Sequence, residues 1–336
     1  LAGPTRMGAR MQKRKADSRR RNDGLELLAI AVRAPSSHNT QPWRFRIESG
    51  GVSVHADRQQ RLPVNDPDDR ELHISCGCAL MNLRVAAAAS GQGYRLEPFP
   101  DGDGSSCLAR LDFRDDAPDA DEAGFAAMVE RRRTCRQRFA PSAVPHDAIE
   151  ALEAMAEAEG ARLQIVEPGE PRRAVARLVE QGDAIQWQDP RWRRELAAWI
   201  RPKGRGDGLA APALLVPFAR AVVRALDMGG RVGAHDRELA EHAPCLVVLS
   251  TDGDERRDWL RAGQALERVL LAACELGLQA SYLNQPVQVE TLRPRLRETL
   301  GTAGHPQVVL RLGYPARDLP ATPRRPLNDV IEVHSR

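Results

Sequence analysis

Apolar residues that recur every three to four positions predict helices in four stretches of this chain. In the first stretch, positions 25, 28, 29 and 32 hold Leu, Leu, Ala and Val, which would share one face of a helix. Pro35 ends this pattern, because proline lacks an N–H and restricts the residue before it. Three longer helices are expected over Arg70–Ser90, Pro145–Glu159 and Asp258–Leu276.

Alternation of apolar and polar residues predicts strands between these helices. Trp43, Phe45 and Ile47 alternate with Arg44 and Arg46, so one face of this strand would be buried. Short runs of the same kind predict strands over Val52–Val54, Leu108–Phe113, Arg162–Val166, Leu246–Ser250 and Val308–Leu312. The mixture of helices and strands predicts an α+β protein. The acidic, proline-bearing stretch Asp115–Glu122 is interpreted as a linker.

Residues 168–240 fit neither pattern well. They hold three of the five tryptophans, at 187, 192 and 199, among arginines, followed by the glycine-rich stretch Gly204–Gly208. A helical excursion or lid fits this composition better than a compact sheet.

An internal repeat organises the rest of the chain. With an offset of 186 residues, Gly77 aligns with Gly263, and Gly91 aligns with Gly277. The two copies share a G-x-A-L start and a glycine end, and each is followed by an expected strand. We therefore expect two related halves in tandem, 22–115 and 122–315, which pack as an intrachain pseudo-dimer. Residues 316–336 would form a C-terminal extension.

Charge and cysteine content change this picture little. Residues 1–21 carry eight Lys/Arg and one Asp, so the formal net charge of +3 divides into +7 for this leader and −4 for the remainder. The leader is interpreted as a disordered extension, with a nucleic-acid-binding arm as the alternative. Six dispersed cysteines indicate no disulfide framework, and Cys76 and Cys78 lack the partner pair of a zinc site. No apolar run is long enough to span a membrane, and a cytoplasmic protein is expected.

Two polar clusters are candidates for chemistry. The loop Pro35–Trp43 offers hydroxyl and amide groups between two prolines, which could bind the edge of a ring or a sugar chain. An ordinary polar connection is the alternative. The second cluster, Arg131–Arg136 with Arg138 beyond it, presents guanidinium groups that suit a phosphate, unless it is simply a solvated basic face. The pair Arg324-Arg325 lies near the C-terminus.

These segments carry a resemblance to the nitroreductase superfamily. A-P-S-S-H-N-T-Q-P-W resembles its flavin-contacting loop, and R-R-T-C-R followed by Phe139 is similar to its phosphate-binding motif R-R-[ST]-x-R. Gly313-Tyr314-Pro315, after the second G-x-A-L helix and Gly277-Leu278, resembles its C-terminal half. Three further stretches resemble the fold-doubled, Acg-like branch: Asp66–Leu80, Glu195–Arg201 and Ser281–Pro286. The resemblance covers most of residues 22–331.

The resemblance implies an FMN site with contacts from several segments. The first-half loop would contact the flavin through Pro35, Ser36, Ser37 and Asn39. The phosphate and ribityl end would be held by Arg132, Arg133, Thr134 and Arg136, with the basic pair Arg324 and Arg325. Backbone groups near the reactive ring nitrogen would come from Leu283, Asn284 and Gln285. His38 is a candidate proton donor, although a structural role is the favoured interpretation.

The distribution of the two motifs predicts one complete site per chain. The first half carries P-S-S-H-N, and the corresponding stretch Glu159–Gln164 of the second half lacks it. The second half carries R-R-T-C-R, for which Arg19–Arg21 is a poor counterpart in the first half.

The implied function is an FMN-dependent oxidoreductase that transfers hydride from NAD(P)H to the flavin and then to a small nitro or quinone acceptor. A non-enzymatic protein that sequesters FMN under a lid is the main alternative, and flavin–oxygen chemistry of the lidded flavin-destructase type is a third. No G-x-G-x-x-G follows a predicted strand, so NAD(P)H would stack directly on the flavin. We expect a small-molecule substrate, no nucleic-acid or membrane partner, and a monomer or weak dimer.

Overall fold

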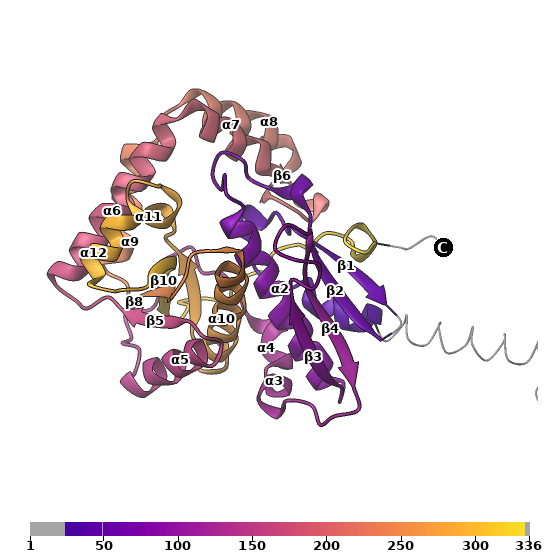
Figure 1. Cartoon of the computed structure of the whole chain (residues 1–336). Coiled ribbons are helices and arrows are strands. Elements are labelled where there is room, and N and C mark those ends of the chain that lie inside the picture. Colours follow the sequence, from indigo (N-terminus) through magenta and orange to yellow (C-terminus); the bar gives the residue numbers. More distant parts are fainter. Residues whose placement is uncertain (1–23, 49, 333–336) are drawn as a thin grey trace, which may run out of the picture.

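The structure, a computed structural model, describes residues 24–48 and 50–332. The basic leader and Arg19–Arg21 therefore lie outside the described residues. Two four-stranded antiparallel sheets stand on either side of a pair of long helices (Figure 1). The first half contains a helix over residues 24–31, then η1 (Ser37–Asn39), β1 (Trp43–Glu48), β2 (Gly51–Ala56), η2 (Arg58–Gln60), α2 (Arg70–Ala89), β3 (Gly93–Pro98) and β4 (Cys107–Arg114). Its strand order is β1-β2-β4-β3.

The second half repeats this arrangement. Its elements are α5 (His146–Ala158), β5 (Arg162–Ile165), β8 (Cys245–Thr251), α10 (Arg256–Glu275), β9 (Gln279–Tyr282), α11 (Gln285–Gln288), α12 (Arg293–Leu300) and β10 (His305–Gly313). The strand order β5-β8-β10-β9 is the order of the first sheet, element for element, with every pair antiparallel. The repeat offset also places the first residue of β3, Gly93, on that of β9, Gln279. The expected doubled α+β fold is confirmed, while the exact limits of the halves stay a prediction.

The two repeated glycines meet where the long helices cross. A Cβ added to Gly77 would lie 2.8 Å from the Cα of Gly263, and a Cβ on Gly263 would lie 2.8 Å from the Cα of Gly77. Each would also collide with a backbone carbonyl of the other helix, that of Leu260 or of Ile74, and these two residues are themselves related by the offset of 186. A residue that touches its own counterpart marks a two-fold relation. The glycines are therefore needed for close approach of α2 and α10 at the pseudo-two-fold axis.

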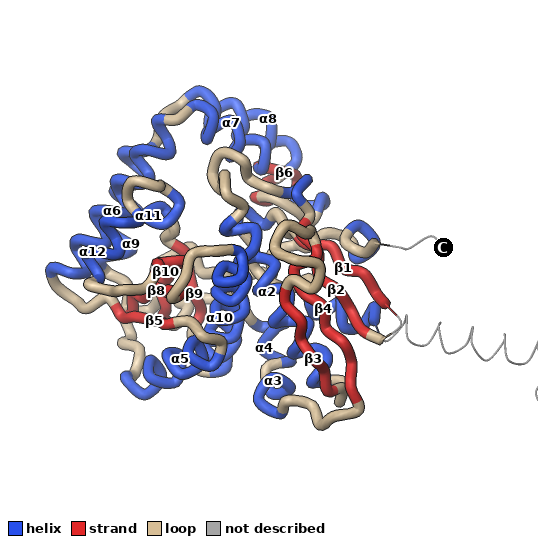
Figure 2. The backbone as a smooth tube through the Cα atoms, viewed as in Figure 1, coloured by secondary structure: helices blue, strands red, loops and turns tan. Residues whose placement is uncertain are grey.

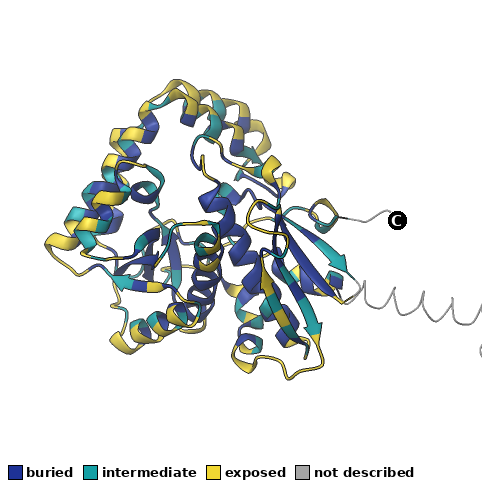
Figure 3. Cartoon of the chain, in the orientation of Figure 1, coloured by how far each residue is buried: buried dark blue, intermediate teal, exposed yellow. Residues whose placement is uncertain are grey.

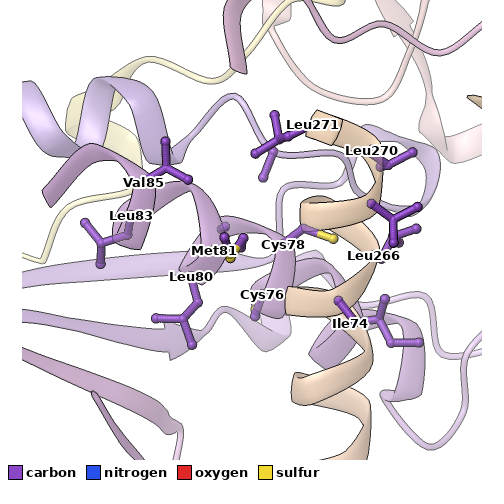
Figure 4. Packing of buried hydrophobic residues seen from close by; sticks show 14 of the residues in the cluster. Ile74, Cys76, Cys78, Leu80, Met81, Leu83, Val85, Leu266, Leu270 and Leu271 are labelled. Atoms are coloured by element: carbon purple, nitrogen blue, oxygen red, sulfur yellow. The ribbon is translucent and has the colours of Figure 1, made fainter. Parts of the chain in front are cut away.

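Helix α2 lies in the middle of the core. By length and composition it could cross a membrane, but 89% of its most apolar window is buried inside the protein. It is apolar on all sides because it packs against both the first sheet and α10. Figure 4 shows Ile74, Cys78 and Met81 of α2 beside α10, whose Leu266, Leu270 and Leu271 complete the cluster. All six cysteines are buried thiols without a disulfide, as expected.

The segment between β5 and β8 is largely helical, as expected. It contains α6 (Glu170–Gln188), α7 (Pro190–Trp199), β6 (Ile200–Pro202), η3 (Lys203–Arg205), β7 (Leu209–Ala211), η4 (Ala213–Leu215), α8 (Val216–Ala225) and α9 (Gly229–Glu241). These elements form an arch that rises from the second half and reaches over the first (Figure 2). We refer to residues 168–240 as the lid.

The chain crosses back to the first half after β10. Phe45 N–H donates to the carbonyl of Val330 (2.8 Å), and Glu332 N–H donates to the carbonyl of Phe45 (2.8 Å), beside η5 (Leu327–Asp329). The connection between the halves is also more ordered than a linker, because it forms α3 (Ala120–Gly124) and α4 (Ala126–Arg131). Glu122, placed in the predicted linker, is fully buried and bound by Arg84, a partner that lies 38 residues away in sequence.

Candidate functional site

A cavity of about 750 Å³ lies between the halves and under the lid. Its volume is in the range of small-molecule and cofactor sites. It is lined by all but one of the residues expected at the site, namely Pro35, Ser36, Ser37, His38, Asn39, Arg132, Arg133, Thr134, Arg136, Leu283, Asn284, Gln285 and Arg324. Four segments far apart in sequence therefore converge on one space: residues 35–39, 132–136 and 283–285, and Arg324.

The first-half loop is held in an unusual backbone conformation. His38, Asn39 and Gln41 have φ angles of 50°, 56° and 54°, a left-handed region that non-glycine residues seldom occupy. Ser36 Oγ accepts a hydrogen bond from the N–H of Gln41 (3.0 Å), which closes the loop on itself. Strain of this kind persists only where the surroundings fix it, and it commonly marks a functional site.

Glu71 connects this loop to the second half. Ser37 Oγ donates to Glu71 Oε2 (2.6 Å), while Gln288 Nε2 donates to Glu71 Oε1 (2.9 Å). Glu71 is only 3% exposed and lines the cavity. Asp66 accepts from the N–H groups of Glu71 (3.0 Å) and Leu72 (2.9 Å) at the start of α2, and burial together with Glu71 raises the pKa of Asp66 to about 7. Glu71 lay within the stretch quoted for the Acg-like branch, but its spacing alone indicated no role.

The R-R-T-C-R segment runs along the edge of the second sheet. Thr134 forms a parallel bridge with Ala280, and Cys135 N–H donates to the carbonyl of Ala280 (2.8 Å). This backbone pairing fixes the segment beside β9, where Arg132, Arg133, Thr134 and Arg136 line the cavity. Arg133 N–H also donates to Gln279 Oε1 (2.7 Å).

Positive charge at this end of the cavity is only partly balanced. Arg132 pairs with the fully buried Glu267 (3.4 Å). Within the described residues, no carboxylate lies within ion-pair distance of four other guanidinium groups that line the cavity, those of Arg133, Arg136, Arg311 and Arg324. Arg311 is buried, Arg133 and Arg324 are half-buried and Arg136 is exposed, so a net positive charge borders the cavity and favours an anionic ligand.

Arg324 fastens the C-terminal tail to the first half. Its guanidinium donates to the carbonyls of Val32 (2.9 Å), Arg33 (2.8 Å) and Ala34 (3.0 Å), at the end of the first helix. Burial lowers the pKa of Arg324 to about 9, and the nearby Arg132 acts in the same direction. The shift comes mainly from the loss of solvation, with a smaller contribution from neighbouring arginines that a bound anion would offset.

The turn after β9 faces the lid. Gln285 Nε2 donates to Asp183 Oδ2 on α6 (3.1 Å) and to Asp236 Oδ2 on α9 (2.8 Å). Burial first, and Asp236 second, raise the pKa of Asp183 to about 7, and burial also raises that of Asp236. One amide thus connects the turn to two carboxyl groups on the lid. Sequence analysis missed both aspartates, because they lie on helices that approach each other only in the fold.

Aromatic residues of the lid complete the cavity wall. Trp187 and Trp192 both line it, and their rings meet edge to face at 5.5 Å. Trp192 Nε1 donates to Asn65 Oδ1 of the first half (2.9 Å), which ties α7 down. Glu195 reinforces this contact by accepting from the N–H groups of Val64 (2.9 Å) and Asn65 (2.8 Å).

The loop also holds the lid through backbone carbonyls. Asn39 Nδ2 lies 3.4 Å from the carbonyl oxygens of both Gly206 and Gly208, and Gln41 Nε2 donates to Gly206 O (2.8 Å). Asn39 was expected to contact a flavin. In the structure it lines the cavity while its amide is engaged with the lid.

Two further predicted residues have distinct surroundings. His38 Nδ1 is buried with no hydrogen-bond partner in the described part of the chain. Burial lowers the pKa of His38, although Glu71 opposes the shift. Arg325 is the one predicted site residue that the structure does not place in the cavity wall. Its guanidinium contacts the carbonyl of Gln41 (3.1 Å) and Asp57 Oδ2 (3.4 Å) instead. Among residues 24–48 and 50–332, no cluster of His, Cys, Asp or Glu could hold a metal ion.

The fold and the cavity define a class: a doubled α+β protein with an interior cavity that is lined by residues of both halves. Comparison with known proteins agrees. Residues 204–314 match the nitroreductase family model. "Putative NAD(P)H nitroreductase Rv3131" of Mycobacterium tuberculosis is 34% identical over 317 residues, which cover 91% of this chain and 90% of that protein. "Putative NAD(P)H nitroreductase acg" of the same organism is 30% identical, covering 92% of this chain and 95% of that protein.

The chain therefore belongs to the nitroreductase family. The Acg-like relative supports the branch to which the quoted motifs pointed. Among solved structures, the FMN-dependent nitroreductase NfnB from Mycobacterium smegmatis in complex with NADPH is 18% identical, and the match covers 64% of this chain and 99% of that chain with a TM-score of 0.42. That similarity is too low to add to the argument.

Proposed function

We propose that this protein binds FMN in the cavity and uses NAD(P)H to reduce a small acceptor of the nitro or quinone class. The observation that carries the proposal is the convergence of the P-S-S-H-N loop, the R-R-T-C-R segment and Arg324 on a single space of about 750 Å³. Its relatives named as NAD(P)H nitroreductases, at 34% and 30% identity, support the donor.

The residues present fit the phosphate end of such a cofactor. Arg133 and Arg136 have no carboxylate partner in the described residues, and Arg133 Nε is buried without any hydrogen-bond partner. Guanidinium groups bind phosphate through paired, charge-assisted hydrogen bonds and stay charged at all physiological pH values. We expect Arg132, Arg133, Thr134 and Arg324 to hold the phosphate and ribityl end.

The opposite end of the cavity suits a planar ring. We expect the loop over Pro35–Asn39 to contact one edge and the turn Leu283–Gln285 to present backbone groups to the other. Bound FMN would supply the hydride chemistry, so the protein needs no acid–base side chain for that step. The protein's own contribution is to orient the ring, to fix the turn through Gln285 and the lid aspartates, and to exclude water beneath Trp187 and Trp192.

Anaerobic reduction tests the proposal. The purified protein, loaded with FMN, should show a flavin spectrum that bleaches on addition of NADPH or NADH and returns when a nitroaromatic or quinone is added. Binding of FMN without bleaching over hours would instead support the sequestering alternative. Loss of bound flavin after reduction and exposure to oxygen would support the flavin-destructase alternative. Failure to bind FMN at all would contradict the proposal at its first step.

A further inference from the structure

The outer edge of the lid carries an apolar face that no described part of the chain covers. Leu214 is 94% exposed, Phe218 71%, Leu215 55% and Leu226 53%. Figure 3 shows the exposed colour running along α7 and α8 at the far end of the arch. An exposed cluster of large apolar side chains commonly marks an interaction surface.

Exposed residues share one side of α8. Phe218, Ala221 and Ala225 are spaced by three and four positions, so they form a single row, and the exposed Leu214 lies just before them in η4. Val216 and Val223 face the opposite way and are buried. Helix α8 therefore carries apolar side chains on two sides. Only the side with Val216 and Val223 packs against the protein.

Positive charge borders this row. Arg224 is exposed at the flank of this row, whereas Arg220 faces the packed side of α8 and donates to the carbonyl of Ile200 (2.9 Å). Residues 189–231 contain nine Lys/Arg and four Asp/Glu, a net charge of +5, whereas the rest of residues 22–336 carries −9. The apolar face thus lies in the basic part of an otherwise acidic body.

We propose that this face, which we call the α8 face (Leu214, Leu215, Phe218 and Leu226 with Arg224), docks on an anionic lipid surface. Exposed apolar side chains within a basic region are typical of segments that lie in a membrane interface, where the apolar side chains enter the lipid and the basic groups meet the headgroup phosphates. A second copy of the chain is a poorer occupant, because a two-fold contact would bring the two basic borders together.

Peripheral docking through α8 would explain why sequence analysis did not predict a membrane partner. That expectation rested on the lack of a spanning segment, and α8 has only 10 residues, too few to cross a bilayer. The α8 face would bind peripherally and reversibly, with a strong dependence on salt. The inference is independent of the proposed activity, since it uses no residue of the cavity.

A tryptophan reporter tests the contact directly. Phe218→Trp in the full chain should be quenched by vesicles of brominated phosphatidylcholine and phosphatidylglycerol, but not by brominated phosphatidylcholine alone. Trp187, Trp192 and Trp199 are buried, so the new indole would dominate the change. Binding through the basic leader alone would not quench a tryptophan on α8, and an unquenched reporter would overturn the proposal.

Paired variants measure the contribution of the face. Leu214→Ser combined with Phe218→Ser should weaken partition into phosphatidylglycerol-containing vesicles by about tenfold or more, since two large apolar side chains are lost. Leu276→Ser, at another exposed leucine (42%), is the matched control and should bind as the unaltered protein does. Arg224→Glu should also weaken binding, whereas Arg95→Glu, exposed on β3 at the other end of the molecule, should not.

Two results would contradict the proposal. One is equal vesicle binding by the Leu214/Phe218 double variant and by Leu276→Ser. The other is a dimer in sedimentation velocity that the same double variant dissociates, because the α8 face would then be a self-interface. All the substituted side chains are exposed, and unchanged circular dichroism should confirm that each variant folds.

Discussion

The pseudo-two-fold axis relates the two ends of the interface between the halves, but one end is open as a cavity and the other is filled with side chains. Exchange of the halves maps Cys78, which lines the cavity, onto Gln264, and maps the loop of residues 33–42 onto the short turn Glu159–Ala161. One end is a cavity with unpaired guanidinium groups. At the other end, side chains of the protein itself fill the space and pair with one another.

The filled end is a buried ion network. Arg84 donates to both oxygens of Glu159 (2.7 and 2.9 Å), to Gln264 Oε1 (2.9 Å) and to the hydroxyl of Tyr94 (2.9 Å). It also reaches the fully buried Glu122, which accepts a hydrogen bond from Tyr94 Oη (2.6 Å). This network joins the first half, the connection and the second half at one point.

The difference shows how a doubled fold keeps a single site. At the cavity, Arg133, Arg136 and Arg324 lack carboxylate partners in the described residues, which leaves their charge for a ligand. At the filled end, Arg84 and Arg268 share Glu159, so the charge is satisfied internally. We therefore expect the cavity residues to govern ligand binding and the filled-end residues to govern stability.

The largest effect is expected from Arg84→Met. The substitution keeps an apolar stem of similar length but leaves Glu122 and Glu159 buried with fewer partners, which should lower the free energy of unfolding by about 3–5 kcal/mol. Urea denaturation measures it. Arg138→Met is the control, because its ion pair with Glu238 is exposed and should contribute little to stability. An equal loss in both variants would show that the network does not hold the halves together.

Arg133→Ala should have the converse effect. Loss of a charge-assisted contact should weaken FMN binding by about 1.5–3 kcal/mol, or roughly 10- to 150-fold in Kd, with little change in the unfolding of the flavin-free protein. Fluorescence titration with FMN measures the Kd. Arg131→Ala, at the exposed neighbour that does not line the cavity, should bind FMN normally. Equal affinities for the two variants would remove Arg133 from the site.

A smaller loss of unfolding free energy is expected from a substitution at the pseudo-two-fold axis, between the two ends. Gly77→Ala would push the new methyl group against the backbone of α10, an overpacking that should cost about 1–3 kcal/mol of unfolding free energy. Gly230→Ala on α9 is a matched helical control with open space around its Cβ, and it should be neutral or stabilising by up to about 1 kcal/mol. If Gly77→Ala were as stable as this control, Gly77 would not be needed for the close approach of α2 and α10.

The smallest effect concerns the pH dependence of the unfolding free energy, to which Asp183 of the lid contributes. The pKa of Asp183 is raised to about 7 in the folded protein, against about 4 in an unfolded chain, so the folded state binds this proton more tightly. The resulting stabilisation is present at low pH and is lost as the pH rises from about 4 to about 7. Asp183→Asn should reduce the slope of the unfolding free energy against pH in this range, with the contribution of Asp66 remaining, whereas the exposed Asp121→Asn should leave the slope unchanged. An unchanged slope in Asp183→Asn would show that Asp183 does not contribute to it.

Much of this comparison could be predicted from sequence. The offset of 186 gave the doubled fold, because Gly77 and Gly263 are required at the crossing and leave a visible signature. The loop and the R-R-T-C-R segment were assigned to one site through the resemblance; both line the cavity, and their contact with FMN stays a prediction. The main elements were placed correctly because each has a regular apolar pattern.

Contacts between distant segments could not be predicted. Glu71, Asp183 and Asp236 acquire their partners only when helices from different parts of the chain meet. Glu122 looked like a solvated linker residue because nothing near it in sequence indicates Arg84. The exposed row on α8 was also missed, because an apolar helix side suggests a core position and only the fold shows that no described residue covers it.

The stoichiometry of bound flavin tests the central claim most directly. Protein stripped of flavin is titrated with FMN, and the number of sites per chain is determined together with the mass of the species in solution. The account predicts one FMN per chain of 336 residues, bound by a monomer as well as by any dimer. Two FMN per chain would mean that the filled end is also a site, and one FMN per two chains would place the site between chains rather than between halves; either result would contradict the account.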